Sequence, residues 1–96
     1  MVSLPHLVIT LGSKGARYIG EEGDFVVAPF EVRPVDTTGA GDTFLGYLLA
    51  SLSKGMSMKE AMSYGSAAAS LQITRQGALA AIPSLQEVET FIGENS

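Results

Sequence analysis

The segment Asp36-Thr-Thr-Gly-Ala-Gly-Asp-Thr-Phe44 joins a glycine-rich polar turn to a strongly apolar helical pattern. Large apolar residues recur at four-residue spacing between Phe44 and Leu52, which predicts an amphipathic helix that begins near Gly41. Gly39 and Gly41 let the backbone fold sharply and keep side chains away from a ligand. The segment therefore predicts a tight turn that presents a helix N-terminus.

The first turn of this helix is a candidate phosphate site. Unpaired backbone N–H groups and the positive end of the helix dipole bind anions there. Asp42 lies in the same turn, where an acid stabilises the helix start but repels a bound phosphate. A general base beside a transferred phosphoryl group would explain this position. Two interpretations of Asp42 are therefore open, a helix-stabilising acid and a catalytic base.

Two other phosphate-binding motifs fit the sequence poorly. A Rossmann fingerprint, G-x-G-x-x-G, needs its third glycine where Phe44 stands, and no clear strand leads directly into the turn. A Walker A loop ends in Gly-Lys-Ser/Thr, which Gly12-Ser-Lys-Gly15 does not supply.

The 36–44 segment strongly resembles the second signature of the PfkB, or ribokinase-like, carbohydrate kinases. The resemblance continues in order through Leu11–Ala16 upstream and through Ala67–Ala69 and Thr74–Ala78 downstream, so it covers nearly the whole chain. It implies an α/β fold, three-layered and Rossmann-like, of which residues 1–96 form the C-terminal, nucleotide-binding part. The N-terminal part of such kinases carries a β-sheet lid and most of the sugar contacts.

The resemblance also implies catalytic roles. Asp42 would be the base that takes the proton from the sugar hydroxyl. The N–H groups of Gly39, Ala40 and Gly41 would hold the charge that develops on the phosphoryl group. Phosphoryl transfer needs this division of labour, because its catalysis is mostly positioning and charge stabilisation.

Two further groups of residues match binding segments of the family. Gly12, Ser13 and Gly15 would lie beside the ribose and phosphates of the nucleotide, although a plain hairpin turn is the alternative. Ser66 matches a position that contacts the adenine or ribose. The positions that match a monovalent-cation site, potassium in the relatives, are Asp36, Thr38, Gln72, Arg75 and Gly77. Backbone carbonyls do most of that binding, and Asp36 can also be an ordinary Asx-turn residue.

The implied reaction transfers the γ-phosphate of ATP, with Mg²⁺, to a hydroxyl of a small sugar or sugar-like alcohol. The chain is short for an enzyme. Its length favours an alternative, a non-catalytic nucleotide-binding fragment or interaction module. A homodimer is compatible with either hypothesis.

Composition limits the partners and the compartment. Ninety-six residues form one domain at most. The net charge of -4 argues against nucleic acid and anionic membrane surfaces as partners. There is no cysteine, no apolar run long enough for a membrane span, and no signal-peptide pattern at the start. We therefore expect a cytoplasmic protein.

Before the central segment, the sequence predicts a β-meander. His6–Leu11 has the form of a strand buried on both faces, and Ala16–Ile19 and Phe25–Ala28 are expected to follow as strands. Pro29 and Pro34 then favour irregular or extended backbone up to the turn.

After the central segment, the sequence predicts two more helices. Gly55 ends the first helix, and Ser57-Met-Lys-Glu60 is a capping box for a second that continues to about Ile73. One face of this second helix carries only small residues, which lets another backbone or a flat ring approach closely. A second capping box, Ser84-Leu-Gln-Glu87, starts a last short helix.

Overall fold

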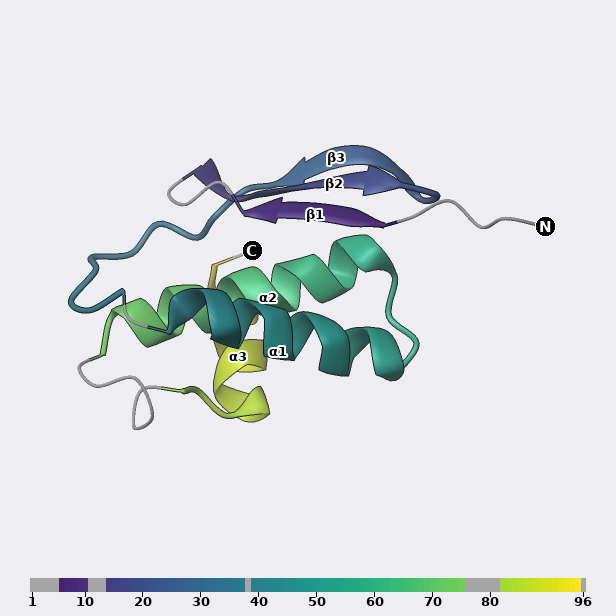
Figure 1. Cartoon of the computed structure of the whole chain (residues 1–96). Helices are drawn as coiled ribbons and strands as arrows, with labels where there is room; N and C mark the ends of the chain where they lie inside the picture. The colour runs from purple at the N-terminus through teal and green to yellow at the C-terminus, as the bar shows by residue number, and fades with distance from the viewer. Residues whose placement is uncertain (1–5, 11–13, 38, 76–81, 96) are drawn as a thin grey trace.

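The computed structural model describes residues 6–10, 14–37, 39–75 and 82–95. Its elements follow the order that the sequence predicts, with three strands before three helices (Figure 1). The strands are β1 (Leu7–Thr10), β2 (Ala16–Gly20) and β3 (Gly23–Val27). The helices are α1 (Ala40–Ser53), α2 (Met58–Ile73) and α3 (Leu85–Glu94).

The three strands form an antiparallel sheet in the order β1-β2-β3, which is the predicted meander. Alternate residues point to opposite faces of a strand, and here only one face is covered. On the covered face Tyr18 is fully buried and stacks on Phe25, with the ring centroids 5.0 Å apart. On the other face Leu7 and Val26 are 50% and 54% exposed. The prediction of a strand buried on both faces is therefore wrong for β1, because no helix among the described residues covers its outer side.

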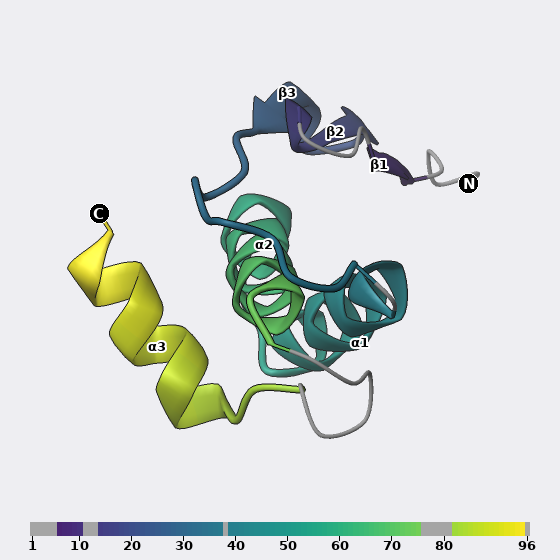
Figure 2. The ribbon, with the colours of Figure 1, turned by 90° about the vertical axis from the view of Figure 1, so that its left-hand side faces the viewer.

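Helices α1 and α2 form an antiparallel pair beneath the sheet (Figures 1 and 2). The link between them is short because Gly55 adopts φ 89, and its N–H donates to the Leu52 carbonyl. The Met56 N–H donates to the Ser51 carbonyl, which completes a Schellman C-terminal motif. A Cβ at Gly65 would lie 2.8 Å from the Phe44 carbonyl oxygen, so the small face of α2 does allow a close backbone approach.

The predicted capping box forms completely at α3, whereas at α2 the structure shows its serine half. Ser57 Oγ accepts from the Glu60 N–H at the start of α2. At the start of α3, Ser84 Oγ accepts from the Glu87 N–H and the Glu87 carboxylate accepts from the Ser84 N–H, so both halves of the capping box form. Fully buried Val88 then packs α3 against α2.

The layers differ from the predicted three-layer arrangement, in which a sheet lies between two layers of helices. Figure 2 shows α1 and α2 on one face of the sheet and α3 beside α2, with the opposite face of the sheet bare. Tight antiparallel hairpins need no crossover helix, which accounts for the bare face. Among the described residues, no helix has the length and apolar character needed to cross a membrane.

Candidate functional site

The turn before α1 depends on one glycine. Gly39 is the N-cap residue of α1 and has φ 79, a left-handed conformation that favours glycine. Its carbonyl accepts from the Thr43 N–H at 3.0 Å, while the Ala40 N–H donates to the Thr37 carbonyl over a longer 3.3 Å. Gly41, expected to share in the sharp fold, is instead helical, and no atom lies within 4 Å of a Cβ placed there. Gly41 therefore contributes open space rather than an unusual backbone angle.

A cavity of about 780 Å³ lies between the end of the sheet, the 29–34 connector, the start of α1 and one face of α2. Its lining includes four of the predicted site residues, Gly15, Ala40, Gly41 and Ser66. The volume is within the range of sites for small molecules and cofactors. The fold thus brings the predicted nucleotide segments and the predicted phosphate-binding turn to one cavity.

Gly15 lines one side of this cavity at a position where the backbone leaves no room for a side chain. It has φ 97, and a Cβ at this position would lie 2.1 Å from the Val27 carbonyl oxygen. The chain entering β2 therefore passes directly against the end of β3. Only glycine fits there without moving one of the two strands.

A smaller cavity of about 390 Å³ lies on the other side of the turn and is lined by Gly39, Asp42 and Gln72. Asp42 is exposed, and Gln72 is buried with 1% exposure. Tyr47 also lines this cavity and donates from its hydroxyl to the Pro83 carbonyl at 2.5 Å. Burial raises the pKa of Tyr47, and the negative charge of Glu87 adds to the effect. The turn thus separates a cavity that contains Asp42 from a larger cavity that contains Gly41.

The predicted cation segments meet at the C-terminal end of α2. The Ile73 carbonyl accepts from the Asp36 N–H at 3.0 Å and from the Val35 N–H at 2.5 Å. The approach to the turn is therefore fixed to the last residue of α2. This contact brings Asp36 near the segment that contains Gln72 and Arg75.

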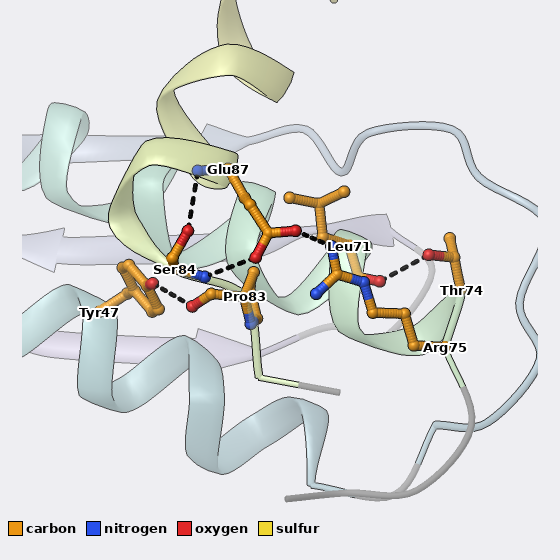
Figure 3. Close-up of polar contacts among 7 residues, drawn as sticks. All are labelled: Tyr47, Leu71, Thr74, Arg75, Pro83, Ser84 and Glu87. Atoms are coloured by element: carbon orange, nitrogen blue, oxygen red, sulfur yellow. Dashed lines mark hydrogen bonds and ion pairs between the residues drawn. The ribbon is translucent and has the colours of Figure 1, made fainter. Parts of the chain in front are cut away.

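The side chain of Arg75 has a structural partner that the sequence did not indicate. Its guanidinium forms an ion pair with the Glu87 carboxylate, the same group that caps α3 (Figure 3). The hydrogen bond from Arg75 lowers the pKa of Glu87, and the bond from the Ser84 backbone acts in the same direction. Arg75 thus ties the end of α2 to the start of α3.

Several predictions cannot be placed. Gly12, Ser13, Thr38 and Gly77 lie outside the described residues. Across the part of the chain that the structure describes, no group of three or more His, Cys, Asp or Glu side chains could hold a metal ion.

Sequence reasoning missed Ser70. It lies one helical turn after Ser66, lines the larger cavity and is 6% exposed. The four-residue spacing from Ser66 was the available signal, because it places both side chains on one face of α2.

Comparison with known proteins identifies the family. The model of the pfkB family carbohydrate kinases matches residues 2–85. This chain belongs to the PfkB family of carbohydrate kinases. It is 39% identical to a ribokinase from Schizosaccharomyces pombe, over 86% of this chain and 26% of that protein. It is 36% identical to fructokinase-2 from Zea mays, over 92% of this chain and 28% of that protein.

A solved structure supports the same fold. The chain aligns with a protein described as a ribokinase II from E. coli, in complex with ATP and Mg²⁺, with a TM-score of 0.88 and 35% identity. The alignment covers 93% of this chain and 29% of the other. The chain thus has the local structure of a ribokinase-fold protein but spans less than a third of the length of these PfkB-family relatives.

Proposed function

We propose that residues 1–96 are the C-terminal, nucleotide-binding part of a cytoplasmic carbohydrate kinase. The reaction transfers the γ-phosphate of ATP to a hydroxyl of a small sugar or sugar-like alcohol. The observation that carries this proposal is the larger cavity, in which Gly15, Ser66 and the start of α1 meet. This grouping brings the residues matching the family's nucleotide segments together with its phosphate-binding turn.

In this proposal the nucleotide and the acceptor hydroxyl lie on opposite sides of the turn. ATP occupies the larger cavity with its phosphates at the N-terminus of α1, where the N–H groups of Gly39, Ala40 and Gly41 hold the developing charge. Gly12 and Ser13 complete the nucleotide contacts. Asp42, on the side of the smaller cavity, orients the acceptor hydroxyl and takes its proton.

Two cations belong to the proposal. Mg²⁺ arrives with ATP, because this ion is usually bound by substrate phosphates and only one or two carboxylates. A monovalent cation, potassium in the proposal, binds between the turn and the end of α2. Its candidate residues are Asp36, Thr38, Gln72, Arg75 and Gly77. The two hydrogen bonds to the Ile73 carbonyl support this pairing of segments.

A non-catalytic nucleotide-binding module is the second candidate function. The observation that favours it is that the chain matches 26% of the length of the Schizosaccharomyces pombe ribokinase. A kinase must also exclude water and orient the acceptor, and the family resemblance assigns both tasks to a lid and sugar contacts in the N-terminal part of such kinases.

A hybrid kinase distinguishes the proposed carbohydrate kinase from the non-catalytic nucleotide-binding module. Residues of this chain replace the aligned segment of the Schizosaccharomyces pombe ribokinase, and ribose-dependent ADP formation is measured. Activity of the hybrid is expected. A hybrid that is folded and binds ATP but forms no ADP would support the non-catalytic module.

The Asp42→Asn variant of the hybrid tests the proposed base. Asparagine keeps hydrogen-bonding capacity at the helix start but cannot accept the proton. We expect kcat to fall ~10²-fold or more, the usual scale of positioned general-base catalysis, with little change in the KM for ATP. A variant whose kcat stays within a few-fold of the unmodified hybrid would show that Asp42 serves only the helix start.

A further inference from the structure

Two serines of α2 that are mostly buried line the larger cavity. Ser66 and Ser70 are 8% and 6% exposed, and both line this cavity. Within the described part of the chain, neither side chain has a hydrogen-bond partner. Ser63, on the same helix, instead donates from Oγ to the Lys59 carbonyl at 3.1 Å. Neither serine oxygen is among the fully enclosed polar atoms that lack a partner, so each hydroxyl is accessible to water or to a ligand in the cavity.

The remaining wall of the cavity is mostly apolar. It is built largely by Pro29, Phe30, Val32, Phe44, Ala69 and Ile73. An apolar wall with a few fixed polar groups is typical of sites that bind a flat organic ligand and orient it by hydrogen bonds. The two serines are therefore suited to orient the ligand in this cavity.

The antiparallel helix pair orders the polar groups along the cavity. Gly65, next to Ser66, lies against Phe44, one turn into α1. Ile73 contacts the backbone at Asp36, just before the turn. Ser70 lies between these two levels, about 6 Å from Ser66 by the spacing of helical neighbours. The order along the cavity is consequently Ser66, then Ser70, then the N-terminus of α1.

We propose that Ser70 binds a ribose hydroxyl of the nucleotide, an inference that rests on the proposed function. A nucleotide has the order base, sugar, phosphate. With the phosphates at α1 and the base toward Ser66, the sugar lies beside Ser70. A serine hydroxyl and a ribose hydroxyl are each both donor and acceptor, so they pair without a charge and without a change of protonation.

The test combines the Ser70→Ala substitution with nucleotides that lack one ribose hydroxyl. Affinities for Mg·ATP, 2′-deoxy-ATP and 3′-deoxy-ATP are measured by calorimetry on the 96-residue chain and on its Ser70→Ala variant. Alanine is the best helix former, so α2 is expected to persist, and circular dichroism verifies this. Ser63→Ala is the matched control, because it removes a hydroxyl that is bonded to its own helix and does not line the cavity.

Ser70→Ala is expected to weaken ATP binding about 3- to 10-fold, the effect of one neutral hydrogen bond. One of the two deoxy nucleotides should bind the original chain more weakly by a similar factor and lose nothing further in the variant. Equal losses for ATP and both deoxy nucleotides, or an unchanged affinity for ATP, would overturn the role of Ser70 and leave the proposed function intact. No binding of ATP by the original chain would instead count against the proposed function itself, and the ribose contact with it.

Discussion

Alanine substitutions at Gly15 and Gly55 separate backbone strain from steric overlap. Both glycines have left-handed backbones, with φ 97 and φ 89. No atom lies within 4 Å of a Cβ at Gly55, whereas a Cβ at Gly15 would lie 2.1 Å from the Val27 carbonyl oxygen. Gly55→Ala is therefore a matched control that has the strain without the overlap.

The magnitudes follow from this geometry. A left-handed backbone destabilises a non-glycine residue by about 1–2 kcal/mol, which is the full effect expected for Gly55→Ala. At Gly15 the new methyl group must also move from 2.1 Å to at least about 3.4 Å from the oxygen, the lower limit of ordinary contact. That shift separates the paired ends of β2 and β3, where Ala16 faces Val27, and weakens one or two hydrogen bonds worth about 1 kcal/mol each. Gly15→Ala should therefore destabilise the chain by about 3 kcal/mol or more.

Urea unfolding followed by circular dichroism measures both free energies of unfolding. A domain of this length is stable by roughly 5–14 kcal/mol, so a loss of about 3 kcal/mol is easily resolved. If Gly15→Ala and Gly55→Ala destabilise the chain equally, the close approach of Gly15 to β3 is wrong, and with it this wall of the larger cavity.

Four other expectations can be checked separately. Glu22 Oε1 accepts from the Met58 N–H at 3.0 Å, so Glu22→Ala should lower the free energy of unfolding by about 1 kcal/mol, while Glu22→Gln, which keeps an acceptor, should lower it less. Because the pKa of Glu87 is lowered in the folded chain, its carboxylate stabilises the fold above the unfolded value of 4.5, and this stability is lost as pH falls through the folded-state pKa. Glu87→Gln keeps the capping box but removes the titrating charge that pairs with Arg75, so the loss of stability at acidic pH should become smaller. An unchanged acidic limb would mean that the ion pair with Arg75 is unimportant. Potassium should activate the hybrid kinase, and equal rates in a bulky organic cation at matched ionic strength would reject the cation site, because screening depends on ionic strength alone. The isolated chain should show negligible kinase activity, and sugar-dependent turnover above ~1 per second, the low end of ordinary enzyme rates, would contradict this.

Locally encoded features of the fold were predictable. The serine caps of α2 and α3 and the glycine that ends α1 each act within a few residues, and the structure has all three helices where these signals place them. The meander followed from short strands separated by hairpin turns. The family signature then supplied the candidate site residues, because that pattern too is contiguous in sequence.

Features that depend on distant partners were not predictable. The carboxylate of Glu22 reaches the start of α2 across 36 positions, and Arg75 pairs with Glu87 across 12 positions. The sequence also misplaced the burial of β1, since an apolar β-branched run is the same whether one face or both are covered. Ser70 escaped notice for a related reason, as a small polar residue on a helix signals a ligand only when its cavity is known.

The forked hydrogen bond at the Ile73 carbonyl has a thermodynamic consequence. One oxygen accepts from the N–H groups of Val35 and Asp36, so the end of α2 is tied directly to the approach to the proposed phosphate-binding turn. The proposed cation at the end of α2 and the proposed nucleotide at the turn would then act on segments that are hydrogen-bonded to each other. If the cation tightens nucleotide binding by some factor, linkage requires the nucleotide to tighten cation binding by that same factor. Measuring ATP affinity against potassium concentration, and potassium affinity against ATP concentration, must therefore give a single coupling free energy.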